Sequence, residues 1–385
     1  MKRKIGVAVG VILIILISVF GILYLVDLDR MSKNEPVLFS TWGRKYAPPV
    51  EKSTVNTKNM KIVLSLEDEI TENSAWCGTF NLIWNDLKNN LAKQDIVFKN
   101  QTELVNNLNK GTFTEENLSE SSYYKTYGIP SPELKKQIEK EIKDKFNEES
   151  DILDDFDFEN ATEYDYFLYC MLKKEFEFTN EYTVFENEKF KKYNNVKYFG
   201  IDGNGKDEIR DALNSQTEIM YYDSNDSFAV KLYTKQNDEV IIVKGNNSKT
   251  FGKIYADVLK RKEEYTGMRH FEIEENLKIP CIDFNLKEEI SELEKQEFKF
   301  SDGRSYEIEK AMQTIEFTLD EKGGRIKSEA GMMANLSSAV ECYATPRQFI
   351  VDDTFTVFLV EKDKKLPYFA AQISDISQVQ ENIIK

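Results

Sequence analysis

The alternation of hydrophobic and polar residues is most informative near the carboxyl end of the chain, between Phe317 and Ile373. A strand-like run ends just before Gly323, a weakly patterned segment of about two dozen residues follows, and two apolar strands close the chain. After Gly323 two kinds of residue alternate: uncharged ones at Gly324, Ile326, Ser328 and Ala330, and charged ones at Arg325, Lys327 and Glu329. Because successive side chains of a strand point to opposite faces, this loop can become a strand with one uncharged face.

The spacing of apolar residues upstream predicts both helices and strands. Intervals of three and four residues predict helices over residues 74–92, 131–146 and 250–265. Asn73 or Ser74 would cap the first helix, and Ser131 ahead of Pro132 would cap the second. Apolar runs predict strands over residues 164–178, 229–234 and 239–243. Neither an internal repeat nor a low-complexity break interrupts this part of the chain, which predicts one large domain over residues 59–380.

The amino-terminal end carries a different pattern. Residues 5–26 form an uncharged apolar run of 22 residues, which as a helix would be about 33 Å long and cross a hydrocarbon core of about 30 Å. Three cations precede the run, namely Lys2, Arg3 and Lys4, so residues 1–4 are expected inside the cell and the rest outside. The alternative is a cleaved signal peptide, but the run is long for one and no small-x-small site follows Val26.

We therefore predict a single-pass cell-membrane protein whose residues 5–26 act as a signal-anchor in the lipid bilayer. Residues 27–58 contain three prolines, several serines and lysines, and no sustained apolar period, so they are expected to form an extracellular spacer. The C-terminal domain lies outside the cell in this prediction, and we expect this ectodomain to be monomeric.

Net charge and cysteine spacing indicate which binding partners and metal sites are not expected. The net charge is −16, and phosphate binding needs clustered positive charge, so nucleic acid is not expected as a partner. The four cysteines lie far apart without a Cys-x-x-Cys pair and are expected to be buried free thiols, with one extracellular disulfide as the alternative; they are Cys77, Cys170, Cys281 and Cys342. We predict no metal and no cofactor.

Two further motifs carry little chemistry. Residues 202–207 resemble a calcium-binding loop, but Lys206 stands at a ligand position and Asp207 where the turn needs glycine, so an acidic turn is expected. His270 is the only histidine in the chain and has no nucleophile nearby in the sequence. A membrane-bound hydrolase is therefore a remote alternative, and we expect no catalytic residues.

Three segments, in order along the chain, resemble the serpins. A surface helix, an acidic connection and a buried strand that ends at Phe178 are similar to the helix that crosses the main serpin sheet and the central strand after it. The strand Leu277–Pro280 with residues 281–293 is similar to a serpin strand that leads into a short helix. Residues 308–323 resemble the long strand that enters the reactive loop. The resemblance implies an α+β fold with a large mixed sheet A, smaller sheets B and C, surrounding helices and a reactive loop at about residues 323–348.

The chain also departs from the family pattern at positions that control opening of the sheet in serpins. The usual run of alanines after the hinge is replaced by residues 324–329. Gln313 stands where a histidine is common, Phe178 where a tryptophan is usual, and Ala371 at the place of a glycine. The implied fold can therefore persist without its conformational switch.

The function implied by the resemblance is inhibition of an extracellular protease, which cleaves the loop and is trapped when the loop inserts into the sheet. The hinge residues implied are Glu321, Gly323, Gly324, Ile326, Ser328 and Ala330. Burying an unpaired charge costs several kcal/mol, and none of the inward-facing hinge positions is charged, so the pattern permits insertion. The outward-facing Arg325, Lys327 and Glu329 are expected to remain in water. The alternative is a non-inhibitory binding or structural module with the same fold.

The bond that the protease would cut is only bracketed by the sequence. Two ways of counting from the ends of the loop place it after Ser337 or near Glu341, and the candidate region comprises Leu336, Ser337, Ser338, Ala339, Val340 and Glu341. Neither Lys nor Arg occurs from Ser328 through Pro346, which argues against a trypsin-like target protease.

Overall fold

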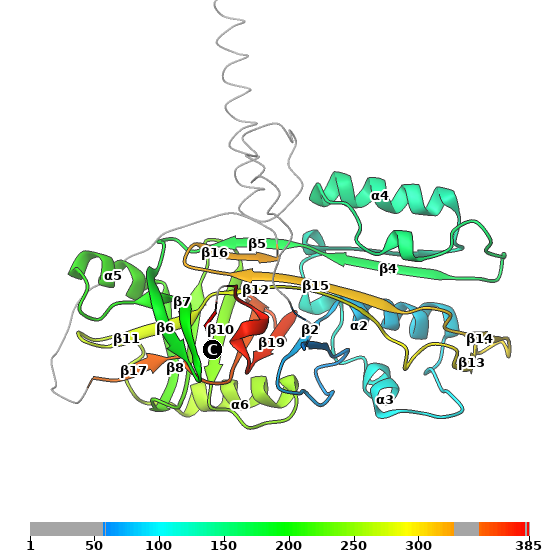
Figure 1. Cartoon of the computed structure of the whole chain (residues 1–385). Coiled ribbons are helices and arrows are strands. Elements are labelled where there is room, and N and C mark those ends of the chain that lie inside the picture. The colour runs from blue at the N-terminus through cyan, green and yellow to red at the C-terminus, as the bar shows by residue number, and fades with distance from the viewer. Residues whose placement is uncertain (1–56, 58, 327–345, 382, 385) are drawn as a thin grey trace, which may run out of the picture.

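A seven-stranded sheet forms the centre of the computed structural model, which describes residues 57, 59–326, 346–381 and 383–384 (Figure 1). Its strand order is β1-β2-β19-β18-β10-β9-β8, and all neighbouring pairs except β1 and β2 are antiparallel. The strands are β1 (Lys61–Ile62), β2 (Ser74–Cys77), β8 (Thr217–Ser224), β9 (Ser227–Tyr233), β10 (Asp238–Lys244), β18 (Phe355–Glu361) and β19 (Phe369–Ile373). All residues of β18 are buried, so this strand runs through the core.

A four-stranded sheet packs beside it, in the order β17-β11-β7-β6. It consists of β6 (Thr183–Phe190), β7 (Tyr193–Ile201), β11 (Asn276–Pro280) and β17 (Gln348–Ile350). β11 and β17 pair in parallel. β17 is the first strand after residues 327–345, so this pairing attaches the chain that follows the predicted loop to the four-stranded sheet.

A third sheet is divided into two parts. One part has the order β12-β15-β16-β5, and the other is the antiparallel pair β3 and β4. The strands are β3 (Tyr123–Gly128), β4 (Phe167–Leu172), β5 (Lys174–Glu177), β12 (Ile282–Glu289), β15 (Met312–Leu319) and β16 (Gly323–Ile326). Only Lys173 separates β4 from β5, so one stretch of chain serves both parts. We call this assembly the split sheet.

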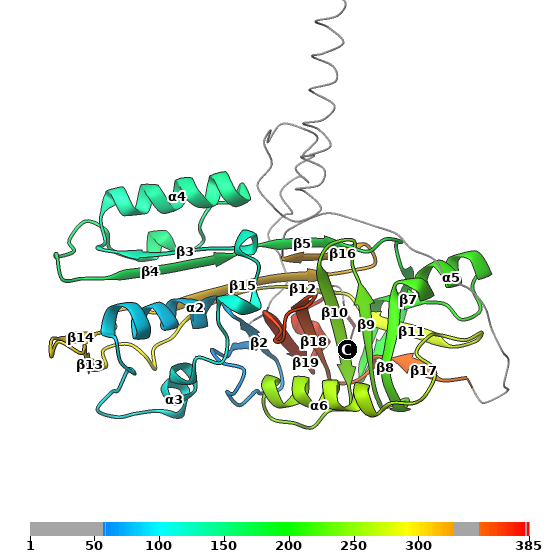
Figure 2. The ribbon, with the colours of Figure 1, turned by 180° about the vertical axis from the view of Figure 1, so that it is seen from behind.

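Helices and a small hairpin cover the sheets (Figures 1 and 2). The α-helices are α2 (Thr79–Asp86), α3 (Glu103–Lys110), α4 (Pro132–Phe146), α5 (Asp207–Ser215) and α6 (Phe251–Glu264), and β13 (Glu297–Lys299) pairs with β14 (Ser305–Glu307). The shorter turns are η1 (Leu87–Ala92), a π-helix, and the 3-10 helices η2 (Glu115–Asn117), η3 (Glu120–Ser122), η4 (Leu153–Asp155) and η5 (Ile376–Gln378). The α+β architecture and the three principal sheets agree with the fold expected from the sequence.

Several local predictions hold and two do not. Ser131 accepts a hydrogen bond from the Leu134 amide at the start of α4, and the expected helix near residue 250 begins with Thr250 as its cap. The predicted helix over residues 74–92 is wrong in its first turn, because Ser74–Cys77 is a buried strand paired with β19. Residues 282–289 are not a short helix but a strand paired with β15 along its whole length.

The membrane predictions are not tested by the structure. In the ranges described, no helix combines the length and the hydrophobicity needed to cross a bilayer. The anchor predicted at residues 5–26 and nearly all of the spacer lie outside these ranges, as does the loop at residues 327–345. Anchoring, orientation and the centre of the loop therefore stay predictions.

Candidate functional site

The hinge that the sequence predicts after the long strand is itself a short strand. β16 lies between β15 and β5, antiparallel to both, with Arg325 opposite Thr318 on one side and opposite Glu175 on the other. Gly323 carries φ +153°, and a Cβ atom there would lie 2.1 Å from the carbonyl oxygen of Phe176. This position therefore requires glycine, because β5 approaches the hinge backbone too closely for any side chain.

Gly324 turns toward the core. A Cβ atom at this residue would lie 2.4 Å from the ring of Phe176 and 2.7 Å from the carbonyl oxygen of Thr318. The uncharged positions of the alternation thus begin on the inner face of the split sheet, next to buried Phe176. Ile326, two residues further along β16, is opposite Lys174 in the strand register.

The turn that leads into β16 is held by backbone and side-chain contacts. The amide of Asp320 donates to the carbonyl of Gly323 at 2.8 Å, and the carbonyls of Glu321 and Lys322 accept from the chain that follows β5. Lys197 donates to the Glu321 carboxylate at 3.0 Å. Although burial raises the pKa of Glu321, its backbone hydrogen bond and Lys197 bring the pKa below its usual range. Glu321 therefore supports the turn as an anion.

Arg325 corrects one expectation about the outer face. The sequence suggested that this side chain remains in water, but it is only 13% exposed. Its guanidinium lies 3.4 Å from Glu148, in the segment after α4, and 3.6 Å from Glu175 on β5. Since the chain segment after α4 covers this part of the sheet, an outward-facing residue of the hinge meets protein carboxylates instead of solvent.

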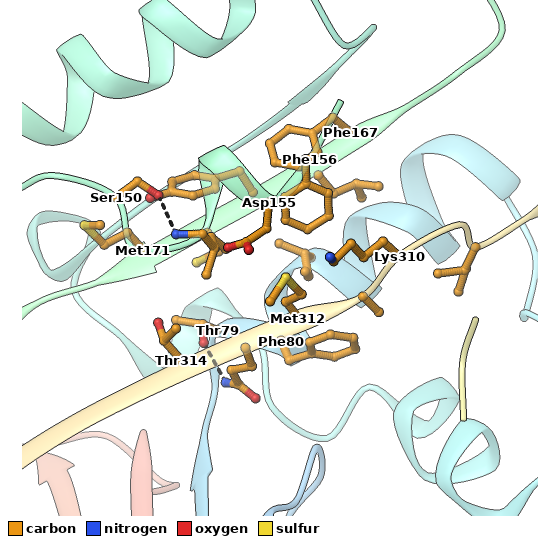
Figure 3. Close-up of a pocket in the computed structure, with 18 of the residues that line it drawn as sticks. Thr79, Phe80, Ser150, Asp155, Phe156, Phe167, Met171, Lys310, Met312 and Thr314 are labelled. Carbon is orange, nitrogen blue, oxygen red and sulfur yellow. Dashed lines mark hydrogen bonds between the residues drawn. The ribbon is translucent and has the colours of Figure 1, made fainter. Parts of the chain in front are cut away.

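Beyond Ile326 the split sheet opens into a cavity of about 670 Å³ (Figure 3). β15 pairs with β12 over its whole length but with β16 only at Thr318 and Leu319. Among the described strands, β4 pairs with β3 alone. The remaining edges of β4 and β15 line the cavity from either side, so strand edges that pair with none of the described residues border the space in line with β16.

Apolar and charged side chains both line this cavity, and the charged ones labelled in Figure 3 are Asp155 and Lys310. Figure 3 shows Phe80 of α2 with Met312 of β15 on one side and Phe156 with Phe167 of β4 on the other. Cys77 and Cys170 also line it, and burial raises the pKa of both thiols. They are therefore protonated and unreactive at neutral pH, in agreement with free thiols; among the described cysteines no disulfide is formed.

Gln313 is a buried polar residue that lines the cavity. Its side-chain amide donates to the carbonyl of Cys77 at 3.1 Å and to the Thr79 hydroxyl at 2.9 Å, so it ties β15 to the start of α2. The residue is 4% exposed, and its Oε1 atom has no hydrogen-bond partner among the described residues. An uncharged amide therefore stands where the family resemblance leads one to expect histidine.

The chain returning from the loop is fixed by Arg347. This side chain donates to Glu275 at 2.6 and 2.8 Å, to the Tyr265 hydroxyl, and to the carbonyls of Met268 and His270. Glu275 is 2% exposed. Burial alone would raise the pKa of this carboxyl, but Arg347 and backbone donors hold it below its usual range. The distal end of the loop is therefore clamped by a buried ion pair.

The structure brings together only part of the predicted site. Glu321, Gly323, Gly324 and Ile326 lie in or beside β16. The remaining residues lie outside the described ranges: Ser328, Ala330, Leu336, Ser337, Ser338, Ala339, Val340 and Glu341. Sequence reasoning missed Glu148, Glu175 and the Arg347 clamp, because no local pattern links residues so far apart in the chain.

Two remaining motifs behave as ordinary structure. The segment at residues 202–207 is a turn in which the Gly205 amide donates to the Asp202 carbonyl. His270 offers its backbone carbonyl to Arg347. Within the described part of the chain, three or more His, Cys, Asp or Glu side chains are nowhere grouped so that they could hold a metal ion.

Comparison with known proteins gives structural neighbours only. No protein-family model and no curated protein sequence matches the chain. A thyroxine-binding globulin in complex with thyroxine is 11% identical with a TM-score of 0.46, covering 79% of this chain and 93% of its own. The thermophilic serpin tengpin in its native state is 14% identical with a TM-score of 0.45, covering 80% and 90%. A serpin from the insect Tenebrio molitor is 14% identical with a TM-score of 0.33, covering 67% and 78%. Likeness at these identities concerns the fold alone.

Proposed function

We propose that this protein is a membrane-anchored, extracellular, serpin-like protease inhibitor that acts by insertion of its cleaved loop into the split sheet. The observation that carries the proposal is the position of β16. Residues 323–326 already form a strand between β15 and β5, and the cavity continues along the same line between β15 and β4.

The existing register shows what each further residue would meet if the same pairing continued. Ser328 would come between Leu172 and Ile315, which both pack in or against the main core. Ala330 would come between Cys170 and Gln313. Small uncharged side chains suit this inner face, since a charge there would be buried without a partner.

The outer face would take the charged residues. Lys327 would come between Lys173 and Glu316, close to Glu148, which already accepts from Lys173 and Arg325. Carboxylates on this face would offset the charge of the outward-facing lysine. The alternation after Gly323 therefore matches both faces of the opening.

The proposed mechanism requires no catalytic group from this chain. A protease attacks the loop, its nucleophile forms an acyl-enzyme, and the freed amino-terminal part of the loop adds as a strand to the unpaired edges of β4 and β15. New backbone hydrogen bonds and the filling of the cavity stabilise the inserted state. The protease is carried along before the acyl-enzyme is hydrolysed.

The target and setting follow from the sequence. Neither Lys nor Arg occurs from Ser328 through Pro346, so we infer a protease with an apolar or broad specificity pocket, not a trypsin-like one. The apolar run at residues 5–26 would place the inhibitor at the outer surface of the cell membrane.

One experiment separates this proposal from its main alternative, a non-inhibitory binding module. The ion pairs of Arg325 with Glu148 and Glu175 favour that alternative, because they attach the hinge strand β16 to its neighbours in the intact protein. The ectodomain is incubated with a panel of proteases, and complexes that survive SDS are sought, while the thermal midpoints of intact and loop-cleaved protein are compared. An SDS-stable complex and a large rise of the midpoint after cleavage are expected; nicking with neither result would reject inhibition.

Ser328→Asp sharpens the test, with Lys327→Asp as its matched control. Both variants introduce the same carboxylate, but only the first would bury it between Leu172 and Ile315. We expect Ser328→Asp to turn the inhibitor into a substrate that is cleaved without complex formation, and Lys327→Asp to keep inhibiting. Ile326 is a poorer choice for this test, because an aspartate there would be opposite Lys174. Equal inhibition by both variants would mean that the register does not continue.

A further inference from the structure

The part of the molecule that borders the cavity on one side has a hydrophobic core of its own. Residues 123–172, which we call the α4 unit, contain β3, α4, η4 and β4. Six buried residues form a cluster separate from the main core: Ile138, Ile142, Leu153, Phe158, Phe167 and Tyr169. Figure 2 shows α4 lying over β3 and β4 on the far side from α2. The face of the unit below α4 therefore has a core of its own, whereas Tyr123 on its other face belongs to the main core.

One carboxylate binds both ends of the α4 unit. Glu361, the last residue of β18, accepts at Oε2 from the amide and the hydroxyl of Ser119, at 2.9 and 2.5 Å. At Oε1 it accepts from the hydroxyl of Ser122 at 2.8 Å and from the ammonium of Lys174 at 2.7 Å. Ser119 and Ser122 directly precede β3, and Lys174 follows β4 after one residue. The chain is therefore fixed where it enters the unit and where it leaves it.

The anchor is buried and charged. Lys174 and Glu361 are each 1% exposed, and Lys174 also donates to Asp238 on β10 at 2.5 Å. Burial would raise the pKa of Glu361, but Lys174, Ser119 and Ser122 hold it below its usual range. Burial raises the pKa of Asp238, which also accepts from the Tyr368 hydroxyl. Glu361 is thus an ionised acceptor in this group.

This anchor lies where the split sheet divides. Lys174 begins β5 and is opposite Ile326, the last described residue of β16, whereas β4, on the other side of Lys173, pairs with neither β15 nor β16 in the described part of the chain. Further ion pairs also tie the unit to the main body. Lys125, near the start of β3, contacts Asp86 of α2 at 2.7 Å with side chains 17% and 6% exposed, and Lys287 contacts Asp155 with side chains 44% and 32% exposed. The buried contacts therefore lie at the end where β3 begins and β4 leaves the unit, and the exposed pair of Lys287 and Asp155 is able to yield.

We propose that Glu361 is a positioning residue that acts as the pivot of the α4 unit. It keeps both chain ends on β18 while the rest of the unit moves relative to β15, and so it sets the width of the cavity. The role of that width in accepting a strand rests on the proposed function, but the pivot itself is a property of the intact protein.

Hydrogen exchange of the intact, uncleaved protein tests the pivot without any protease, so a failure of the inhibitor proposal would leave this test unaffected. Glu361→Gln keeps the shape but removes the charge and two of the acceptor interactions. We expect exchange in β3, β4 and α4 to become about tenfold faster, as for the loss of a charge-assisted hydrogen bond, while β9 and β19 keep their protection.

Glu239→Gln is the matched control, because Glu239 pairs at 2.8 Å with Lys231, which belongs to the same seven-stranded sheet and not to the α4 unit. It should leave exchange in the α4 unit unchanged. Should Glu361→Gln not fold, the double variant Ser119→Ala and Ser122→Ala removes only the hydroxyls at the entering end and should accelerate exchange in β3 first. Uniform acceleration over the whole chain, or none in the α4 unit, would overturn the proposal.

Discussion

The two ends of the loop are held in opposite ways. The proximal end, β16, is held by backbone pairing with β15 and β5, and its one charged residue, Arg325, makes ion pairs at 3.4 and 3.6 Å. The distal end is held by side-chain chemistry, because Arg347 donates to four groups: the Glu275 carboxylate at 2.6 and 2.8 Å, the Tyr265 hydroxyl, and the carbonyls of Met268 and His270. Backbone pairing can be extended residue by residue, whereas a buried ion pair is either intact or broken. The proximal end is therefore built to continue, and the distal end to stay in place.

The largest effect is expected at the distal end. Arg347→Met removes the partner of a buried carboxylate and should lower the free energy of unfolding by about 3 kcal/mol or more. Chemical denaturation of the ectodomain measures this loss. Arg304→Met is the control, because Arg304 pairs with Asp302 in an exposed position, with side chains 50% and 47% exposed, and little change is expected there. Equal stability of the two variants would show that the distal end is not clamped.

A smaller effect is expected at the proximal end, from Gly324→Ala. The added Cβ would overlap the ring of Phe176, and overpacking of this kind costs about 1–3 kcal/mol. β16 should relieve the overlap by leaving the sheet, which faster hydrogen exchange of the Gly323–Ile326 amides would report. Gly128→Ala is the matched control, since its nearest atom would be 3.4 Å away. Unchanged exchange in β16 would mean that the hinge does not pack against β5.

The pH dependence of the distal clamp gives a third comparison. Arg347 holds the pKa of Glu275 below its ordinary 4.5, so the pair stabilises the fold above that pH and loses this effect as the pH falls through the lowered value. The difference in thermal midpoint between the natural protein and Arg347→Met should therefore shrink below about pH 4.5. A difference that stays constant down to pH 3 would assign the stabilisation to packing of Arg347 instead of its charge.

The smallest effect is expected for Arg325→Met. The ion pairs of Arg325 are long and its Nη1 atom is buried with no hydrogen-bond partner in the described part of the chain, so removing the guanidinium should change stability by less than about 1 kcal/mol. Chemical denaturation checks this value beside Arg347→Met. A loss as large as that of the distal variant would abolish the contrast between the two ends.

The local elements that carry their own signals were predictable. Ser131 and Pro132 mark the start of α4, and the alternating residues before Asp320 mark β15. The first turn of the predicted helix at Ser74 failed, because pairing with β19 in the core overrides helical spacing over four residues. The strand at residues 282–289 was missed for the same reason, as its pairing with β15 is not visible in its own residues.

For the candidate site, too, the sequence predicted local features but not contacts between distant residues. The alternation after Gly323 indicated which hinge residues share a face, since this depends only on the period of a strand. It could not indicate that Arg325 is covered by Glu148, 177 residues away, or that Glu361 meets Ser119 across 242 residues.

By itself, the sequence determined the order of the elements, the uncharged face of the hinge and the apolar segment at residues 5–26, because each depends on neighbours along the chain. The tertiary structure alone decided where the split sheet opens, which carboxylates meet Arg325 and Arg347, and that one buried glutamate joins both ends of the α4 unit. These features depend on contacts between distant residues, and burial gives such contacts their strength by removing the water that would otherwise compete for each charge.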